Sequence, residues 1–387
     1  MFDNSFNKLT LPQPIKISFI LLGSFLSLSL LLLSFSVQTA VGEAAGSGPV
    51  SPTVMDHYDV PFANGSPRNL IVEPGSSPPS IWFTMPEADA IGNLVVTSTV
   101  DYQFTRYPVT GVEPFDLAYD SSRDWIWFTL AGSAGIGYFA ADNPAVITEV
   151  NTLSGENPAF IDVAPGGDVW FTEPAAQQFT RYQLAGSQFE TFEYTYNCSP
   201  APCPQATPTH LAVLDDNSVW FIDPVEFYLV EYNPVTQSYN ANRVRDNFIQ
   251  PAFTPSALTM DDNEPWVGST SKGWVGRYAP GTLTGFLGFD LPIVNSGINS
   301  MAYSEYESRE LWFTLPDKGR VGMLRLSSNY KFNSYGEARV TEDSSSRPLD
   351  IVAAADGNVW IADAGANTIG QWQAPYLLPV YLPQLIK

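Results

Sequence analysis

Hydrophobic and aromatic residues gather in short runs around a tryptophan, and these runs recur along most of the chain. Each run, such as Ile81-Trp82-Phe83-Thr84, combines the β-branched and aromatic residues that favour a buried strand. Successive tryptophans are 43 to 50 residues apart. The seven tryptophans are Trp82, Trp127, Trp170, Trp220, Trp266, Trp312 and Trp360. A fixed period of this length indicates a repeat architecture.

Two further positions keep a fixed relation to each tryptophan. Nine residues after it comes an aliphatic residue or phenylalanine, which glycine follows in five of the seven copies. These partners are Ile91, Ile136, Phe179, Leu229, Val275, Val321 and Ile369. Before each tryptophan lies a Pro-x-x-[Leu/Ile] motif, as in Pro67–Leu70, although the sixth copy, Ile298–Met301, is degenerate. Residues typical of hairpin turns separate the motif from the tryptophan run.

Each unit therefore reads as a strand, a tight turn, the tryptophan strand, a turn, the aliphatic-glycine strand and a variable strand. Four antiparallel strands per period are typical of a β-propeller blade, so the sequence predicts an all-β, seven-bladed propeller over residues 56–375. The last unit lacks its fourth strand. We expect residues 57–62 to supply that strand and close the ring, which removes two unpaired sheet edges.

The N-terminal segment indicates export. Residues 17–37 are uncharged and mostly apolar, Lys8 and Lys16 precede them, and Gly42-Glu43-Ala44 fits a signal cleavage site. We expect residues 1–44 to be a secretory signal peptide, with a retained membrane anchor as the alternative. A linker, 45–55, leads to the propeller, and an apolar tail containing prolines, 376–387, follows it. The expected location is secreted or extracytoplasmic, with association at the cell surface as an option.

Composition narrows the range of partners. The net charge is −22, which repels phosphate backbones, so we exclude nucleic acid as a partner and expect membrane contact only through an uncleaved N-terminal segment. Only two Cys and two His are present, too few for a zinc cluster of these residues. Cys198 and Cys203 fit a disulfide that closes a short loop in an oxidising compartment. We expect a monomer that binds a small molecule, a glycan or an envelope protein.

At this point the repeat resembles a known family. The third copy, Pro158-Ala159-Phe160-Ile161 followed by Gly167–Glu173, and the seventh, Thr368–Trp372, are similar to the blade pattern of the virginiamycin B lyase, or streptogramin lyase, family. The resemblance implies a seven-bladed propeller and a metal-assisted elimination that opens a cyclic depsipeptide antibiotic at its ester linkage. It also implies magnesium held by a carboxylate, and histidines that act near neutral pH at the channel mouth.

The catalytic positions implied by this resemblance are not matched here. Arg68 stands where the family has a tyrosine, and Asn299 where it has a histidine in the sixth blade. In the seventh blade, Arg347 and Leu349 replace a glutamate and a second histidine. An arginine at the metal carboxylate position repels a cation, and neither Asn299 nor Leu349 can accept a proton. The sequence therefore predicts the scaffold without the lyase activity.

Other residues of the motif are candidates for a site at the channel mouth. We expect binding by residues that differ among the blades: His210, Asp116, Asp350, Arg68 and Phe160. A divalent cation, magnesium or calcium, on Asp116, Asp350 and Glu173 is an open alternative. We place a non-catalytic binding module first, because a fold alone does not supply a function. The alternatives are a metal-dependent lyase or lactonase with a rearranged site, and a structural cell-surface module.

Overall fold

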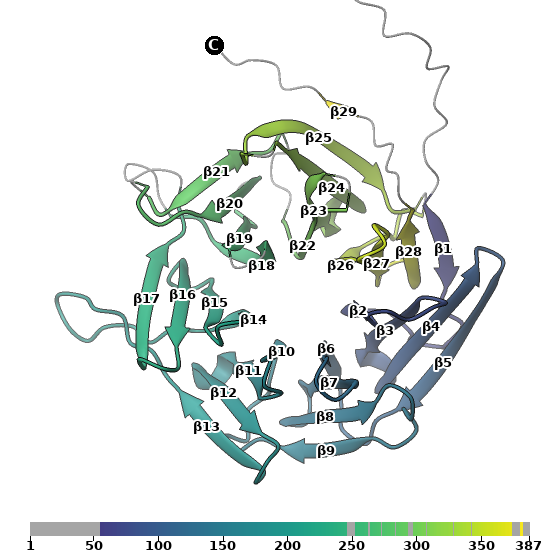
Figure 1. Cartoon of the computed structure of the whole chain (residues 1–387), viewed down its shortest axis with the longest axis horizontal. Helices are drawn as coiled ribbons and strands as arrows, with labels where there is room; N and C mark the ends of the chain where they lie inside the picture. The colour runs from purple at the N-terminus through teal and green to yellow at the C-terminus, as the bar shows by residue number, and fades with distance from the viewer. Residues whose placement is uncertain are drawn as a thin grey trace, which may run out of the picture. The chain divides into compact units, whose positions relative to one another are not determined.

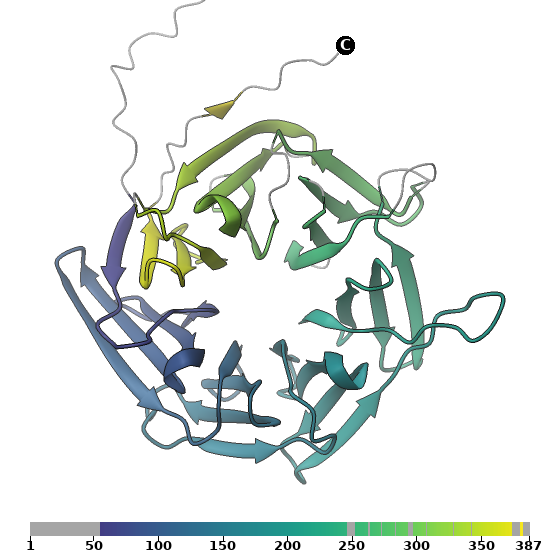
Figure 2. The same ribbon diagram turned by 180° about the vertical axis from the view of Figure 1, so that it is seen from behind.

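Seven antiparallel sheets form the described part of the chain (Figure 1). The structure, a computed structural model, describes residues 55–245, 252–261, 264–271, 273–282, 284–292, 297–306, 308–327, 329–341, 343–373 and 380–381. The expected signal segment, most of the linker and most of the C-terminal tail lie outside these residues. Figure 2 shows the same seven sheets around a common axis from the opposite side. The all-β, seven-bladed prediction is confirmed.

We number the blades 1 to 7 by the order of their tryptophans, and in blades 1 to 6 the strands run outward in chain order (Figure 1). Blades 1 to 3 contain β2 (Leu70–Val72), β3 (Ser80–Met85), β4 (Ala90–Ser98), β5 (Asp101–Pro108); β6 (Pro114–Asp120), β7 (Trp125–Leu130), β8 (Gly135–Ala140), β9 (Thr148–Asn151); β10 (Ile161–Val163), β11 (Val169–Glu173), β12 (Gln178–Gln183) and β13 (Gln188–Phe192).

The next three blades repeat this order. They contain β14 (Thr209–Val213), β15 (Val219–Asp223), β16 (Tyr228–Asn233), β17 (Ser238–Arg243); β18 (Pro255–Asp261), β19 (Glu264–Ser269), β20 (Trp274–Tyr278), β21 (Phe286–Asp290); β22 (Met301–Ser304), β23 (Arg309–Leu315), β24 (Arg320–Leu326) and β25 (Phe332–Arg339). A short fifth strand, β29 (Val380–Tyr381), pairs with β25. Helical structure in the described residues is limited to three single turns, η1 (Pro86–Ala88), η2 (Pro174–Ala176) and η3 (Pro316–Lys318). Among these residues, no helix has the length and apolar character needed to cross a membrane.

Blade 7 combines the first described strand with three strands from near the end of the chain. Its inner strands are β26 (Pro348–Ala353), β27 (Val359–Asp363) and β28 (Thr368–Trp372), and its outer strand is β1 (Asp56–Asp59). β1 pairs antiparallel with β28, and the buried Tyr58 donates a hydrogen bond to Gln371 at 2.7 Å. The predicted closure by the N-terminal segment is confirmed, although the strand ends at Asp59. Pro61 lacks the N–H that a longer ladder needs.

The repeated tryptophans pack between neighbouring blades. All seven are at most 4% exposed. Trp82 and Ile91 of blade 1, for example, share a cluster with Ile126 and Phe128 of blade 2. Each of the seven apolar clusters pairs a tryptophan with its partner nine residues later and joins two adjacent blades. The fixed spacing in the sequence therefore records seven equivalent interfaces.

The glycine of the aliphatic-glycine pair makes room on the other face of the sheet. Gly92 lies opposite Phe83 in the pairing of β3 with β4. A Cβ at Gly92 would lie 2.2 Å from the Phe83 ring, and Gly137 and Gly322 face a phenylalanine in the same way. The tryptophan thus packs toward the next blade, while the following phenylalanine covers the glycine and packs toward the previous one.

Candidate functional site

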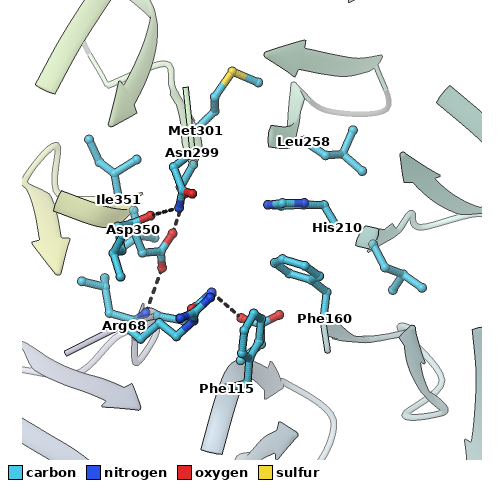
Figure 3. A pocket seen from close by; sticks show the side chains of 16 residues that line it. Arg68, Phe115, Phe160, His210, Leu258, Asn299, Met301, Asp350 and Ile351 are labelled. Carbon is cyan, nitrogen blue, oxygen red and sulfur yellow. Dashed lines mark hydrogen bonds between the residues drawn. The ribbon is translucent and has the colours of Figure 1, made fainter. Parts of the chain in front are cut away.

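A central cavity of about 220 Å³ lies where the inner strands of the seven blades begin (Figure 3). All seven blades contribute residues to its wall. The five binding residues expected from the sequence, Arg68, Asp116, Phe160, His210 and Asp350, all line it. The cavity is smaller than the ~300–1,000 Å³ typical of pockets for drug-sized ligands, so it suits a smaller molecule.

Irregular strand pairing turns several of these side chains toward the axis. The pairing of β6 with β7 shifts between Pro114 and Leu117, and that of β26 with β27 shifts between Pro348 and Asp350. A similar shift next to Thr209 affects β14. Such bulges re-aim side chains at the ends of strands. The proline of the motif favours this break because it donates no ladder hydrogen bond.

The threonine that follows the Trp-Phe pair fixes the start of the inner strands. Thr84 accepts a hydrogen bond from the Asn69 N–H at 3.1 Å and donates one to the Phe115 carbonyl of the next blade at 3.0 Å. Thr129 does the same between Asp116 in its own blade and Ala159 in blade 3. The repeated motif therefore holds the lining residues at a fixed height in the ring.

The two carboxylates of the cavity connect neighbouring blades. One oxygen of Asp116 accepts a hydrogen bond from the Asn69 side chain, and the other accepts one from the Ile161 N–H, both at 3.0 Å. Asp350 accepts the Ser300 hydroxyl on one oxygen and the Leu70 N–H, at 2.8 Å, on the other. Each carboxylate thus fastens its own blade to both of its neighbours. Sequence analysis expected ligand-binding groups here, whereas the structure shows acceptors already engaged.

Burial changes the ionisation of these acids. It raises the pKa of Asp116 to about 7, and the nearby Asp350 adds to the increase, while the hydrogen bond from the Ile161 main chain opposes it. Burial likewise raises the pKa of Asp350, against the opposing hydrogen bonds from Ser300 and Leu70. Near neutral pH the cavity therefore carries less negative charge than two ordinary aspartates would supply.

Aromatic groups make a continuous wall across blades 1 to 4. The Arg68 guanidinium lies 4.2 Å from the centre of the Phe115 ring. Phe115 meets Phe160 edge to face at 5.3 Å, and Phe160 stacks on His210 with ring centres 3.8 Å apart and planes 25° from parallel. Figure 3 shows His210 and Phe160 across the cavity from Asp350 and Asn299. Flat, apolar surfaces of this kind bind rings or hydrocarbon chains.

His210 is a neutral imidazole in this setting. Burial lowers its pKa to about 4, the positive charge of Arg68 lowers it further, and an interaction with the Asn299 main chain opposes the shift. Its Nδ1 atom is buried and has no hydrogen-bond partner among the described residues. No hydrogen bond in the described part of the chain joins it to Asp116 or Asp350. Among the described residues, His210 and these carboxylates therefore do not form a hydrogen-bonded acid-base group.

Glu173 lies away from the cavity. It ends β11, is 1% exposed, and accepts hydrogen bonds from Ser154, Gln178 and Thr180. The described residues contain no group of three His, Cys, Asp or Glu arranged to hold a metal ion. With the Asp116 and Asp350 oxygens engaged and the Arg68 guanidinium in the same cavity, the side chains present do not suit a divalent cation.

Sequence reasoning missed part of the site. Leu258, Met301 and Ile351 line the cavity, although their place in the motif indicates core residues. Asp162 was also missed: it is half-buried in β10 and outside the cavity lining, it accepts the Val213 N–H of blade 4 at 2.8 Å, and desolvation raises its pKa to about 6. Asp162 directly follows the Pro-x-x-[Leu/Ile] motif. The only signal in the sequence was an acidic residue within a short predicted strand.

The disulfide lies outside the cavity. The structure joins Cys198 and Cys203, with their Cα atoms 5.3 Å apart, in an exposed loop between β13 and β14. An isolated pairing of Thr195 with Gln205 closes the base of this loop. The loop is thus tied at two levels, and neither level contributes to the cavity wall.

Comparison with known proteins finds solved structures of similar fold, among them streptogramin lyases. No protein-family profile matches the chain, and no curated protein matches it. Among solved structures, virginiamycin B lyase from Staphylococcus aureus aligns with a TM-score of 0.67 and 21% identity, covering 82% of this chain and 98% of that one.

Two further structures agree with this result. A catalytically inactive form of the same lyase with quinupristin gives a TM-score of 0.66, 21% identity and the same coverage. A streptogramin B lyase gives 0.66 at 19% identity, covering 85% of this chain and 98% of that one. In its fold, the chain is therefore a seven-bladed β-propeller similar to the streptogramin lyases.

Proposed function

We propose that this chain is an exported, non-catalytic binding module that holds a small molecule in its central cavity. The observation that carries the proposal is that the cavity wall contains two kinds of side chain, those that connect blades and those that face the cavity. The carboxylates of Asp116 and Asp350 are engaged between blades, whereas the rings of Phe160 and His210 face the cavity. A cavity that combines an aromatic and apolar face with polar groups that can fix a ligand's orientation matches the general character of ligand sites.

A lyase reaction of the streptogramin kind lacks support at this site. Arg68, Asn299 and Leu349 occupy positions where the family resemblance implies catalytic groups, and all three line the cavity. The Asn299 amide donates a hydrogen bond to the Leu349 carbonyl at 2.6 Å, so it joins blades 6 and 7. None of these side chains can take a proton from carbon near neutral pH. The cavity is also too small to enclose a cyclic depsipeptide.

The binding proposal is tested by screening a small-molecule library against the purified protein by ligand-observed NMR. Leu258→Trp places a large ring in the cavity, and Val235→Trp adds the same ring at a residue 83% exposed. We expect bound compounds to be lost with Leu258→Trp and retained with Val235→Trp. Compounds that bind both variants as they bind the parent would contradict a central site.

Absence of catalysis is tested separately. The protein is incubated with a streptogramin B antibiotic and magnesium, and ring opening is followed by mass spectrometry. We expect the intact ring to persist. Ring opening that a chelator abolishes would overturn the non-catalytic assignment.

Export rests on residues 17–44 and on the disulfide. N-terminal sequencing of the protein recovered from outside the cytoplasm tests it. We expect the mature chain to begin just after Ala44. An uncleaved chain that remains in the soluble cytoplasmic fraction would contradict export.

A further inference from the structure

Arg68 is a cation without a partner in the cavity. Within the described residues, its guanidinium makes no hydrogen bond or ion pair, and the Phe115 ring, 4.2 Å away, supports its flat face. Its main-chain N–H donates to the Thr84 carbonyl at 3.0 Å, which fixes the start of the side chain. Burial lowers the pKa of Arg68 most, and the positive charge of Arg347 lowers it further, against the opposing charges of Asp116, Asp350 and Glu113, so a second positive charge contributes to the local potential. A forked guanidinium held in this way is suited to a carboxylate.

The carboxylates of the cavity do not fill this role. Asp116 and Asp350 direct their oxygens at donors of neighbouring blades, namely the Ile161 and Leu70 N–H groups. Burial raises the pKa of Asp116 to about 7, so part of its negative charge is neutralised near neutral pH. The charge on Arg68 therefore remains available to a molecule that enters the cavity.

Part of the wall is apolar or aromatic, beside the polar side chains of Asn69, Asn299 and Ser300. The stacked rings of Phe160 and His210 lie on one side, and Leu258, Met301 and Ile351 extend the apolar surface (Figure 3). The buried Nδ1 of His210 adds one polar atom without a partner among the described residues. This arrangement complements a ligand that has one anionic end and one flat apolar body.

We propose, building on the binding function above, that the ligand is a small monocarboxylic acid with a flat apolar body. Its carboxylate pairs with the Arg68 guanidinium, and its body lies against the Phe160–His210 stack. A dianion such as phosphate is disfavoured, because Asp116 and Asp350 share the cavity with a single unpaired arginine. A cation is disfavoured by Arg68 itself.

The test compares acids with their amides, which have nearly the same shape but no charge. Benzoate, phenylacetate and cyclohexanecarboxylate, each with its carboxamide, are titrated at pH 7.5 and followed by NMR. We expect each acid to bind more tightly than its amide by about ten- to a hundredfold, the range of a charge-assisted hydrogen-bonded pair. We expect the aromatic acids to bind more tightly than the saturated one.

Variants at Arg68 separate charge from geometry. Arg68→Met keeps the stem on Phe115 and removes the charge, so the acids should lose about ten- to a hundredfold in affinity. Arg68→Lys keeps the positive charge but lacks the forked guanidinium, so its affinity for the acids should lie between those of the parent and Arg68→Met. Arg243→Met, in the outer strand β17, is the matched control and should bind as the parent does. Thermal unfolding confirms that each variant is folded.

The outcomes distinguish this inference from the binding function. Acids and amides of equal affinity, or undiminished binding to Arg68→Met, would overturn the carboxylate assignment alone. A different result is that none of the three acids binds, while another compound binds the parent and not Leu258→Trp. In that case the carboxylate inference fails and the proposed binding module stands. If no compound of any class binds, both proposals fail.

Discussion

Two pairs of side chains in the central cavity act in opposite ways. Asp116 and Asp350 direct both carboxylate oxygens at neighbouring blades and act as fasteners of the ring. Phe160 and His210 stack on each other and leave a ring nitrogen without a partner among the described residues. The contrast shows that a residue that breaks the repeat at the channel mouth has one of two roles, closing the ring or meeting a ligand.

The largest expected effect comes from removing a fastener. Asp350→Ala leaves the Leu70 N–H and the Ser300 hydroxyl without their acceptor. A buried polar group without a partner costs roughly 1–3 kcal/mol, so the free energy of unfolding should fall by about 2–3 kcal/mol. Chemical denaturation followed by tryptophan fluorescence measures it.

Phe160→Leu is the matched control across the cavity. It removes a ring stack, which is worth about 0.5–1.5 kcal/mol, and leaves the blade connections intact. If this variant loses as much stability as Asp350→Ala, the two pairs do not differ in role, and the comparison is wrong.

A second effect comes from the histidine at acidic pH. The pKa of His210 is lowered from 6.5 to about 4 in the folded chain, so the folded state disfavours the charged ring. The stability that this contributes is present above pH 6.5 and is lost as the pH falls toward 4. The parent should therefore lose about 1–2 kcal/mol between pH 7 and pH 5 through this group.

His210→Phe sharpens this test. The substituted ring can still stack on Phe160 but does not titrate, so the loss at acidic pH should be absent. At pH 8 its unfolding free energy should lie within about 1.5 kcal/mol of that of the parent, because phenylalanine cannot make the interaction of His210 with the Asn299 main chain. Parallel pH profiles of the two proteins between pH 7 and pH 5 would show that His210 does not titrate as inferred.

The smallest expected effect is the change in unfolding free energy that Asp116 causes between pH 6.5 and pH 8. Because the pKa of Asp116 is raised from 3.8 to about 7, its protonated form is favoured in the folded state. The stability that this contributes is fully present below pH 3.8, is lost as the pH rises from about 4 to 7, and the last part of the loss falls just above pH 7. Between pH 6.5 and pH 8 the parent should lose about 1 kcal/mol through this group, and Asp116→Asn should flatten the profile. A profile of unchanged slope in that variant would contradict the assignment.

Most of the residues that line the cavity were predictable from the sequence, but their separate roles, connecting blades or facing a ligand, were not. The seven copies of the Pro-x-x-[Leu/Ile] motif place Arg68, Asp116, Phe160, His210 and Asp350 on one ring, and the structure confirms that all five line one cavity. Glu173 entered the candidate metal set because it lies three residues after a tryptophan, yet its carboxylate accepts hydrogen bonds from its own part of blade 3.

What the sequence by itself determined is the repeat. The seven tryptophans, each with an apolar partner nine residues later, specify seven equivalent interfaces, because the packing between adjacent blades is local and recurs with every period. The closure by β1 was also predictable, since an incomplete last unit and an unmatched first strand leave one solution. Only the tertiary structure decided the partners of the carboxylates. Asp116 reaches Ile161 in the next blade along the chain, whereas Asp350 reaches Leu70, 280 positions away, because closing the ring places blades 7 and 1 side by side.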